Sequence, residues 1–89
     1  MSKKRTRIEI INDILNVIAE KQKIKPTHLM YKSNLSHTLM KSYLEELIVK
    51  EMVQKVNNKE YEYLVITEKG IEFIGKFKKM KEFEETFGL

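Results

Sequence analysis

The segment from Asn34 to Ile48 constrains the fold of this chain more than any other stretch. Its apolar side chains recur near helical spacing and form one stripe: Leu35, Met40, Tyr43, Leu44, Leu47 and Ile48. Ser36 precedes this stripe, and its hydroxyl can accept a hydrogen bond from an otherwise unpaired amide one turn later. The segment therefore predicts a helix with Ser36 as its N-cap and with one face built for a core.

The outward face of this predicted helix changes character along its length. Its first two turns carry side chains that are mostly small or basic: His37, Thr38, Leu39, Lys41 and Ser42. Acids follow only at Glu45 and Glu46. A helix that reads DNA needs this polarity, because its N-terminal turns meet base edges and phosphates. An amphipathic helix with an ordinary solvated face is the alternative, and the rest of the chain has to distinguish the two.

The length and composition indicate one soluble globular domain. The chain has 89 residues, of which 42% are hydrophobic and 34% charged, so the core is sufficient for folding but too small for a deep active-site cleft. No apolar run is long enough to span a membrane, and the N-terminus lacks the apolar segment of a signal peptide. We therefore expect a cytoplasmic protein, associated with the nucleoid, or located in the host cytoplasm if a virus or plasmid encodes it.

Catalysis and metal binding are not expected. The chain has no cysteine, which excludes disulfides and thiolate metal sites, and its 2 histidines form no convincing metal set. No serine or carboxylate pair stands in a recognisable catalytic frame, and no glycine-rich phosphate loop is present. The sequence thus predicts no enzyme activity, no catalytic residue, no metal and no cofactor.

Positive charge is concentrated in two parts of the chain, although the net charge is only +4. Residues 1–7 contain four cations and no acid: Lys3, Lys4, Arg5 and Arg7. Between Lys21 and Leu44 acids are again missing, and the cations are Lys21, Lys23, Lys25, Lys32 and Lys41. This distribution is typical of a phosphate-binding surface. A generally lysine-rich composition is the alternative, but it explains the acid-free interval less well.

Two helices are predicted before Ser36. The first extends from Ile8 to Ala19. Four of its residues share one face: Ile8, Ile11, Leu15 and Ile18. Three more widen the apolar surface: Ile10, Ile14 and Val17. Such a helix is central to the fold or contacts a second chain. Residues 24–25 are suited to a very short strand. Pro26 then starts a helix that ends near Tyr31, and Asn34 can take the left-handed backbone of a tight turn. This order is that of a helix-turn-helix.

A hairpin and a long helix are predicted after the third helix, which ends near Lys50. Residues 52–56 and 61–66 are rich in β-branched and aromatic side chains, and the polar segment 57–60 separates them. Leu64 and Ile66 share the parity expected to face the core. Tyr61 and Tyr63 share the other, where a stacking platform for single strands is a minor alternative.

The last predicted helix starts after Thr67, which is suited to cap it. It carries an apolar stripe: Ile71, Ile74, Phe77, Met80, Phe83 and Phe87. This stripe packs back on Ile10, Ile14 and Val17 or meets its counterpart in a second subunit, and we favour a homodimer. Gly70 and Gly75 weaken the helix slightly, and either permits close approach of another helix.

The order of these elements resembles the winged helix-turn-helix. Residues 34–47 are similar to the recognition-helix consensus of archaeal winged-helix regulators, Met52 and Val53 to the start of their wing, and residues 66–74 to its exit. The resemblance extends from about Arg5 to Phe83. It is closest to small archaeal DNA-binding proteins, chromatin-associated or regulatory, that dimerise through a C-terminal coiled-coil helix. Their relatives occur on archaeal viruses and plasmids.

Three features depart from that family. Glu51 stands where the family usually has glycine, which leaves the end of the third helix open. Leu39 occupies a position that is commonly polar, where it can touch a thymine methyl or a partner protein. The final helix is short compared with the long coiled-coil members, so the geometry of the dimer does not carry over.

The expected fold is α+β and mostly helical: a winged helix-turn-helix with a two-stranded wing and a long C-terminal helix. A single domain, 1–89, is divided into a basic arm at 1–7, a three-helix core at 8–50, a wing hairpin at 52–66 and a dimerisation helix at 67–87. We expect the arm to be disordered until it binds DNA.

The predicted function is double-stranded DNA binding by a homodimeric transcriptional regulator that uses its third helix in the major groove. We expect base contacts from His37, Thr38, Lys41 and Ser42, and phosphate contacts from Lys32 and Ser36. The wing tip and the arm would add further contacts through Asn57, Asn58, Lys59, Lys3, Lys4, Arg5 and Arg7. An architectural DNA-binding protein without sequence preference and a protein-interaction module, which Leu39 favours, are the alternatives.

Overall fold

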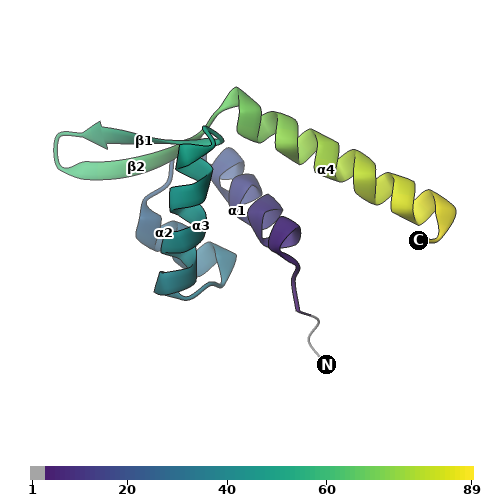
Figure 1. Ribbon diagram of the computed structural model, residues 1–89. Helices are drawn as coiled ribbons and strands as arrows, with labels where there is room; N and C mark the ends of the chain where they lie inside the picture. The colour runs from purple at the N-terminus through teal and green to yellow at the C-terminus, as the bar shows by residue number, and fades with distance from the viewer. Residues whose placement is uncertain (1–3) are drawn as a thin grey trace.

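The computed structural model describes residues 4–89 and forms a three-helix unit, a hairpin and a projecting helix (Figure 1). The elements in chain order are α1 (Arg7–Lys21), α2 (Pro26–Ser33), α3 (His37–Val49), β1 (Val53–Asn58), β2 (Tyr61–Ile66) and α4 (Glu68–Phe87). This order confirms the predicted mostly helical α+β architecture. The hairpin extends to one side of the three helices, whereas α4 projects to the other side (Figure 1).

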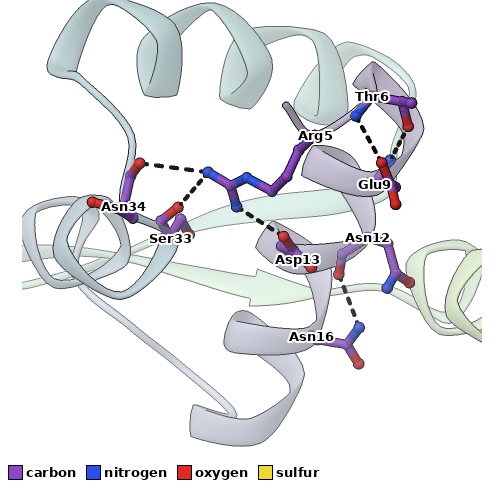
Figure 2. Close-up of polar contacts among 8 residues, drawn as sticks. All are labelled: Arg5, Thr6, Glu9, Asn12, Asp13, Asn16, Ser33 and Asn34. Carbon is purple, nitrogen blue, oxygen red and sulfur yellow. Dashed lines mark hydrogen bonds and ion pairs between the residues drawn. The ribbon is translucent and has the colours of Figure 1, made fainter. Parts of the chain in front are cut away.

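The first helix starts one residue earlier than predicted because Thr6 and Glu9 form a capping box. The backbone N–H of Thr6 donates to Glu9 Oε1 at 2.8 Å, and the backbone N–H of Glu9 donates to Thr6 Oγ1 at 3.2 Å (Figure 2). The buried side of α1 consists of Ile11, Ile14, Leu15 and Ile18. Ile8, which we expected on this side, lies in the first turn beyond the end of the buried stripe and is exposed.

The core lies where α1, α2, α3 and the hairpin meet. The helices and strands contribute Leu29, Met40, Leu44, Leu47, Val53 and Leu64 to it. Ile24 joins the core from the connection between α1 and α2, and its backbone forms a bridge with Leu64, with N···O distances of 3.1 and 2.8 Å. Of the very short strand predicted at residues 24–25, only this single bridge at Ile24 forms. Removal of these apolar side chains from water is the main free-energy gain of folding.

The helix-turn-helix forms as the sequence predicted. Helix α2 continues to Ser33, two residues beyond the expected end, and Asn34 then takes the left-handed conformation with φ 54° and ψ 48°. Leu35 is half-buried and packs against the core. The hydroxyl of Ser36 accepts a hydrogen bond from the backbone N–H of Leu39 at 3.2 Å, so α3 starts with the predicted N-cap.

The end of α3 has a left-handed residue at Glu51, the position where the resemblance led us to expect glycine. Glu51 takes φ 61°, and its N–H donates to the carbonyl of Ile48 at 3.0 Å. The next N–H, of Met52, donates to the carbonyl of Leu47 at 2.9 Å. The hydroxyl of Thr67 donates to the carbonyl of Glu51 at 2.6 Å, which holds this turn from outside. The C-cap therefore forms without glycine.

The wing is an antiparallel pair of strands in which Val53 faces Ile66 and Asn58 faces Tyr61. Because Asn57 and Asn58 belong to β1, only Lys59 and Glu60 form the turn, which is shorter than the predicted four-residue segment. Leu64 is fully buried, and Ile66 is partly buried against the core. The predicted inward parity of β2 is therefore confirmed.

Helix α4 packs against the core through its first half. The backbone N–H of Gly70 donates to Thr67 Oγ1 at 3.2 Å, which confirms the predicted cap, and Phe73 and Ile74 lie against the core. Gly70 permits a close approach as predicted, but to the backbone before β1 and not to a helix. A Cβ at this position would lie 2.5 Å from the carbonyl oxygen of Met52.

Candidate nucleic-acid interface

The outward side chains at the start of α3 form one continuous surface. His37, Thr38, Lys41 and Ser42 line a shallow hollow of about 440 Å³ together with Glu45. All five side chains are exposed, and the first turn of α3 contains no acidic residue. The structure thus brings the four predicted base-contacting residues to the same face.

Helix geometry adds positive potential to this surface. The unpaired N–H groups of the first turn and the helix dipole make an N-terminus attractive to anions. Lys41 lies one turn later and has no ion pair within residues 4–89. The surface can therefore accept phosphate oxygens at its start and present hydrogen-bonding groups to base edges beside them.

A second hollow continues this surface toward the wing. It has a volume of about 230 Å³, and its polar rim includes His37 and Lys41 of α3 and Lys55 and Glu62 of the wing. Lys55 Nζ lies 3.7 Å from Glu62 Oε1. Apolar side chains also line it: Pro26, Met30, Met40, Leu44 and Ile48. The hollow shows that α3 and the wing border one concave region and do not face in unrelated directions.

The tip of the wing is polar and exposed. Asn57, Asn58 and Lys59 are all exposed, and they lie at the end of the hairpin that is farthest from the helices (Figure 1). Lys59 has no ion pair in the part of the chain that the structure describes. The predicted wing-tip cation is therefore available to an external anion.

Arg5 has internal partners, which corrects the expectation of a free basic arm. Its Nη1 lies 2.8 Å from Asp13 Oδ2, and its Nη2 donates to the carbonyl of Ser33 at 3.0 Å and to that of Asn34 at 3.4 Å (Figure 2). One guanidinium thus joins α1 to the turn between α2 and α3. No local pattern could predict this contact, because Arg5 and Ser33 are far apart in the chain.

Arg7 is also engaged within the molecule. Its guanidinium forms an ion pair with Glu46 on α3, and Lys50 Nζ lies 3.3 Å from the same carboxylate. The hydrogen bond from Arg7 lowers the pKa of Glu46, and that bond raises the pKa of Arg7. Of the other predicted arm residues, Lys4 is exposed, and Lys3 lies outside the described residues.

Lys32 does not lie with the residues that open α3. It lines a separate hollow of about 290 Å³ between α2 and the wing, with Lys21, Lys23, Lys25 and His28. Ammonium groups also cover the tyrosines of the wing, because Lys25 Nζ lies 3.8 Å from the ring centre of Tyr61 and Lys23 Nζ lies 4.8 Å from that of Tyr63. This arrangement disfavours an open stacking platform.

The predicted dimerisation residues divide into two groups. Ile74 packs against the core, and Phe77 is half-buried, stacked on Phe73 with 6.4 Å between ring centres. Four remain exposed, by 42 to 64%: Ile71, Met80, Phe83 and Phe87. Lys81 Nζ lies 3.7 Å from Glu9 Oε2 of α1, and the exposed side chains of Phe83 and Phe87 follow Lys81 along α4. The second half of α4 therefore leaves an apolar surface uncovered.

No cluster of three or more histidine or acidic side chains within residues 4–89 is arranged to hold a metal ion. In the same part of the chain, no helix is both long enough and apolar enough to cross a membrane.

Solved structures of a DNA-binding protein and of transcriptional regulators share this fold. Sso10a-2, a DNA-binding protein from Sulfolobus solfataricus, superimposes with a TM-score of 0.78 and 22% identity over 93% of this chain and 85% of its own. The transcriptional regulator PcaV from Streptomyces coelicolor superimposes with a TM-score of 0.77 and 13% identity, over 97% of this chain and 62% of its own. Oxidised MarR from E. coli superimposes with a TM-score of 0.69 and 18% identity, over 74% of this chain and 48% of its own.

The chain thus spans most of the Sulfolobus protein but only about half to three fifths of these two regulators. At such identities the likeness concerns the fold. No curated protein is significantly similar to the chain in sequence. A protein-family description, winged helix-turn-helix, matches residues 4–85. The chain therefore belongs to the winged helix-turn-helix family.

Proposed function

We propose that this protein is a transcriptional regulator that binds double-stranded DNA as a homodimer and places α3 in the major groove. The observation that carries this proposal is the acid-free start of α3, where His37, Thr38, Lys41 and Ser42 share one exposed hollow. Hydrogen-bonding and basic groups at the N-terminal turns of a helix are what base edges and phosphates require. The protein would act in the cytoplasm, on the nucleoid.

The contacts divide into two kinds. His37, Thr38, Lys41 and Ser42 face the base edges, whereas Ser36 and the first-turn amides of α3 meet phosphates that fix the docking position. The wing tip reaches a flanking groove or the backbone through Asn57, Asn58 and Lys59. The similarity to Sso10a-2, described as DNA-binding, and to PcaV, described as a transcriptional regulator, supports this function.

Dimerisation would use one face of the second half of α4. Phe73, Met80 and Phe87 are seven residues apart, and Phe83 stands between the last two at the complementary position of a coiled-coil repeat. Ile71 is exposed but lies roughly 180° around the helix from Met80, at 3.6 residues per turn. We therefore assign Met80, Phe83 and Phe87 to the centre of the dimer contact, and we place Ile71 outside it.

The binding test selects from a library of random duplexes and then measures fluorescence anisotropy over a series of salt concentrations. We expect enrichment of a two-fold symmetric motif and an affinity that falls steeply with salt. Salt-sensitive binding without an enriched motif would replace the regulator with an architectural protein. Absence of binding at low salt would contradict DNA binding altogether.

The dimer test measures molar mass by light scattering during size-exclusion chromatography. The chain has a mass of 10.6 kDa, and we expect twice this value for the wild type. A variant with Met80→Glu and Phe83→Glu places charge in the proposed contact and is expected to be monomeric. Ile71→Glu adds charge to an exposed apolar position on the other side of α4 and serves as the control. Equal masses for these two variants would contradict the assigned face.

A further inference from the structure

Five cationic or titratable side chains gather on the far side of α2 from the reading surface of α3. Lys21, Lys23, Lys25, His28 and Lys32 line one hollow of about 290 Å³, together with Ile24 and Tyr63. They come from the end of α1, from the connection that follows it and from the outer side of α2. We call these five residues the α2 cluster. No acidic residue lines this hollow.

The four lysines of the α2 cluster lack carboxylate partners. None of them forms an ion pair within residues 4–89, whereas Lys50, Lys55 and Lys81 each do. Lys23 lies over the ring of Tyr63, a contact that orients the side chain without neutralising its charge. Like charges that converge on one concave surface raise the local positive potential, which an anion relieves.

The α2 cluster is separate from the surface of α3. Pro26 and Met30 line the hollow beside α3, whereas His28 and Lys32 line the hollow of the cluster. At 3.6 residues per turn, Pro26 and His28 point roughly 160° apart around α2. The α2 cluster therefore faces away from the surface that we assign to the groove segment under α3.

We propose that the α2 cluster is a second phosphate-binding site, which takes the backbone of DNA outside the segment contacted by α3 and the wing. The required chemistry is several phosphate oxygens within reach of ammonium groups, and a DNA backbone presents these at regular spacing. This inference rests on the proposed DNA binding and adds to it. The cluster contributes affinity and salt dependence rather than sequence preference, because phosphate contacts carry no base information.

The test compares two variants of equal charge. Lys21→Gln combined with Lys32→Gln removes two exposed members of the α2 cluster, and Lys78→Gln combined with Lys79→Gln removes two exposed lysines of α4 as the control. None of these four side chains is in an ion pair within the described residues. Circular dichroism verifies that both variants fold.

Fluorescence anisotropy of DNA binding is measured over a salt series on two duplexes. One duplex is limited to the α3 site, and the other extends well beyond it.

On the long duplex, we expect the cluster variant to reduce the salt slope of log K by about two, since each lost phosphate contact lowers it by about one. On the short duplex, we expect no difference between wild type and either variant. The inference is overturned if the cluster variant binds the long duplex as the wild type does, or if it weakens both duplexes equally. Wild type that binds neither duplex would instead contradict the proposed function itself.

Inorganic triphosphate distinguishes DNA from a free polyanion. We expect it to compete with the long duplex at lower concentrations than with the short one, and we expect the cluster variant to lose this difference. Specific triphosphate binding that the cluster variant loses, while long-duplex binding stays unchanged, would assign the site to a small ligand and overturn the DNA assignment.

Discussion

The N-terminal arginines and the lysine of α3 are all cations outside the apolar stripes of the sequence, but their surroundings in the structure differ. The residues compared are Arg5, Arg7 and Lys41. Arg5 lies between Asp13 and the carbonyls of the helix-turn-helix turn, and Arg7 pairs with Glu46. Lys41 is exposed, and within residues 4–89 no carboxylate pairs with it. The arginines therefore stabilise the folded structure through internal contacts, whereas the lysine is available to a ligand.

A count of basic residues therefore does not locate a phosphate-binding surface. An arginine can donate several hydrogen bonds in a fixed plane, which suits it to joining a carboxylate and two carbonyls, as Arg5 does. A lysine carries a single strongly hydrated charge that pairs readily with an exposed phosphate. The absence of nearby acids, rather than the presence of cations, marks the region from Lys21 to Leu44.

Substitution of Lys41 is expected to reduce DNA affinity more than any other single change proposed below. Because we assign Lys41 to the base edges, Lys41→Ala is expected to weaken DNA binding by about 1–3 kcal/mol. Its unfolding midpoint in urea is expected to match that of the wild type. Lys79→Ala, which removes an exposed lysine from α4, is the control. An unchanged DNA affinity for Lys41→Ala would show that this lysine does not contact DNA.

The second expected effect is on stability and concerns Arg5. Arg5→Gln removes an ion pair and two hydrogen bonds to carbonyls at a site that remains about one-third exposed, so we expect a loss of about 1–2 kcal/mol in the free energy of unfolding. Lys4→Gln, at the exposed neighbouring position, is expected to leave stability unchanged. Urea denaturation measures both variants. If Arg5→Gln is as stable as Lys4→Gln, the arginine does not serve the fold.

Ser36 caps α3 and is also proposed to contact phosphate, and two substitutions distinguish these roles. We expect them to have a smaller effect than the loss of Arg5. Ser36→Ala loses the acceptor for the N–H of Leu39 and is expected to cost about 1 kcal/mol of stability. Ser36→Asp keeps a capping oxygen but adds negative charge where phosphates would lie, so it is expected to retain stability and to lose DNA affinity. Thr67→Ala removes a cap on α4 and is expected to lower stability alone. Equal DNA affinity for Ser36→Asp and the wild type would place phosphates elsewhere.

Local signals predicted much of the fold. The cap at Ser36, the left-handed turn at Asn34, the strand-like residue at Ile24 and the cap at Thr67 all depend on neighbours within a few positions, and the structure confirms each. The sequence did not predict the left-handed backbone of Glu51, because the resemblance led us to expect glycine at this position. Its conformation is held by Thr67, which lies beyond the wing and offers no local cue.

The candidate site was less predictable where it depends on residues distant in sequence. The partners of Arg5 and Arg7 lie on other helices, so no periodicity within the arm could indicate them. Lys32 follows the expected turn, yet the direction of its side chain depends on how α2 packs against the wing, which places it in the α2 cluster. Residues on a single helix surface, such as His37 and Lys41, were grouped correctly because helical spacing alone relates them.

The ion pair between Arg7 and Glu46 is expected to change the pH dependence of stability only slightly. Folding lowers the pKa of this carboxyl, mainly through the hydrogen bond from Arg7, so the folded state favours the charged form. The stabilisation is complete above the ordinary pKa of a glutamate and is lost as pH falls through the lowered value. Urea unfolding between about pH 6 and pH 3 is therefore expected to show a smaller loss of stability for Glu46→Gln than for the wild type. Arg7→Gln leaves the carboxyl in place but removes its main partner, and it is expected to match Glu46→Gln in this range. If both variants follow the wild type, the pair contributes nothing to folding, and Arg7 joins Lys41 among the cations available to DNA.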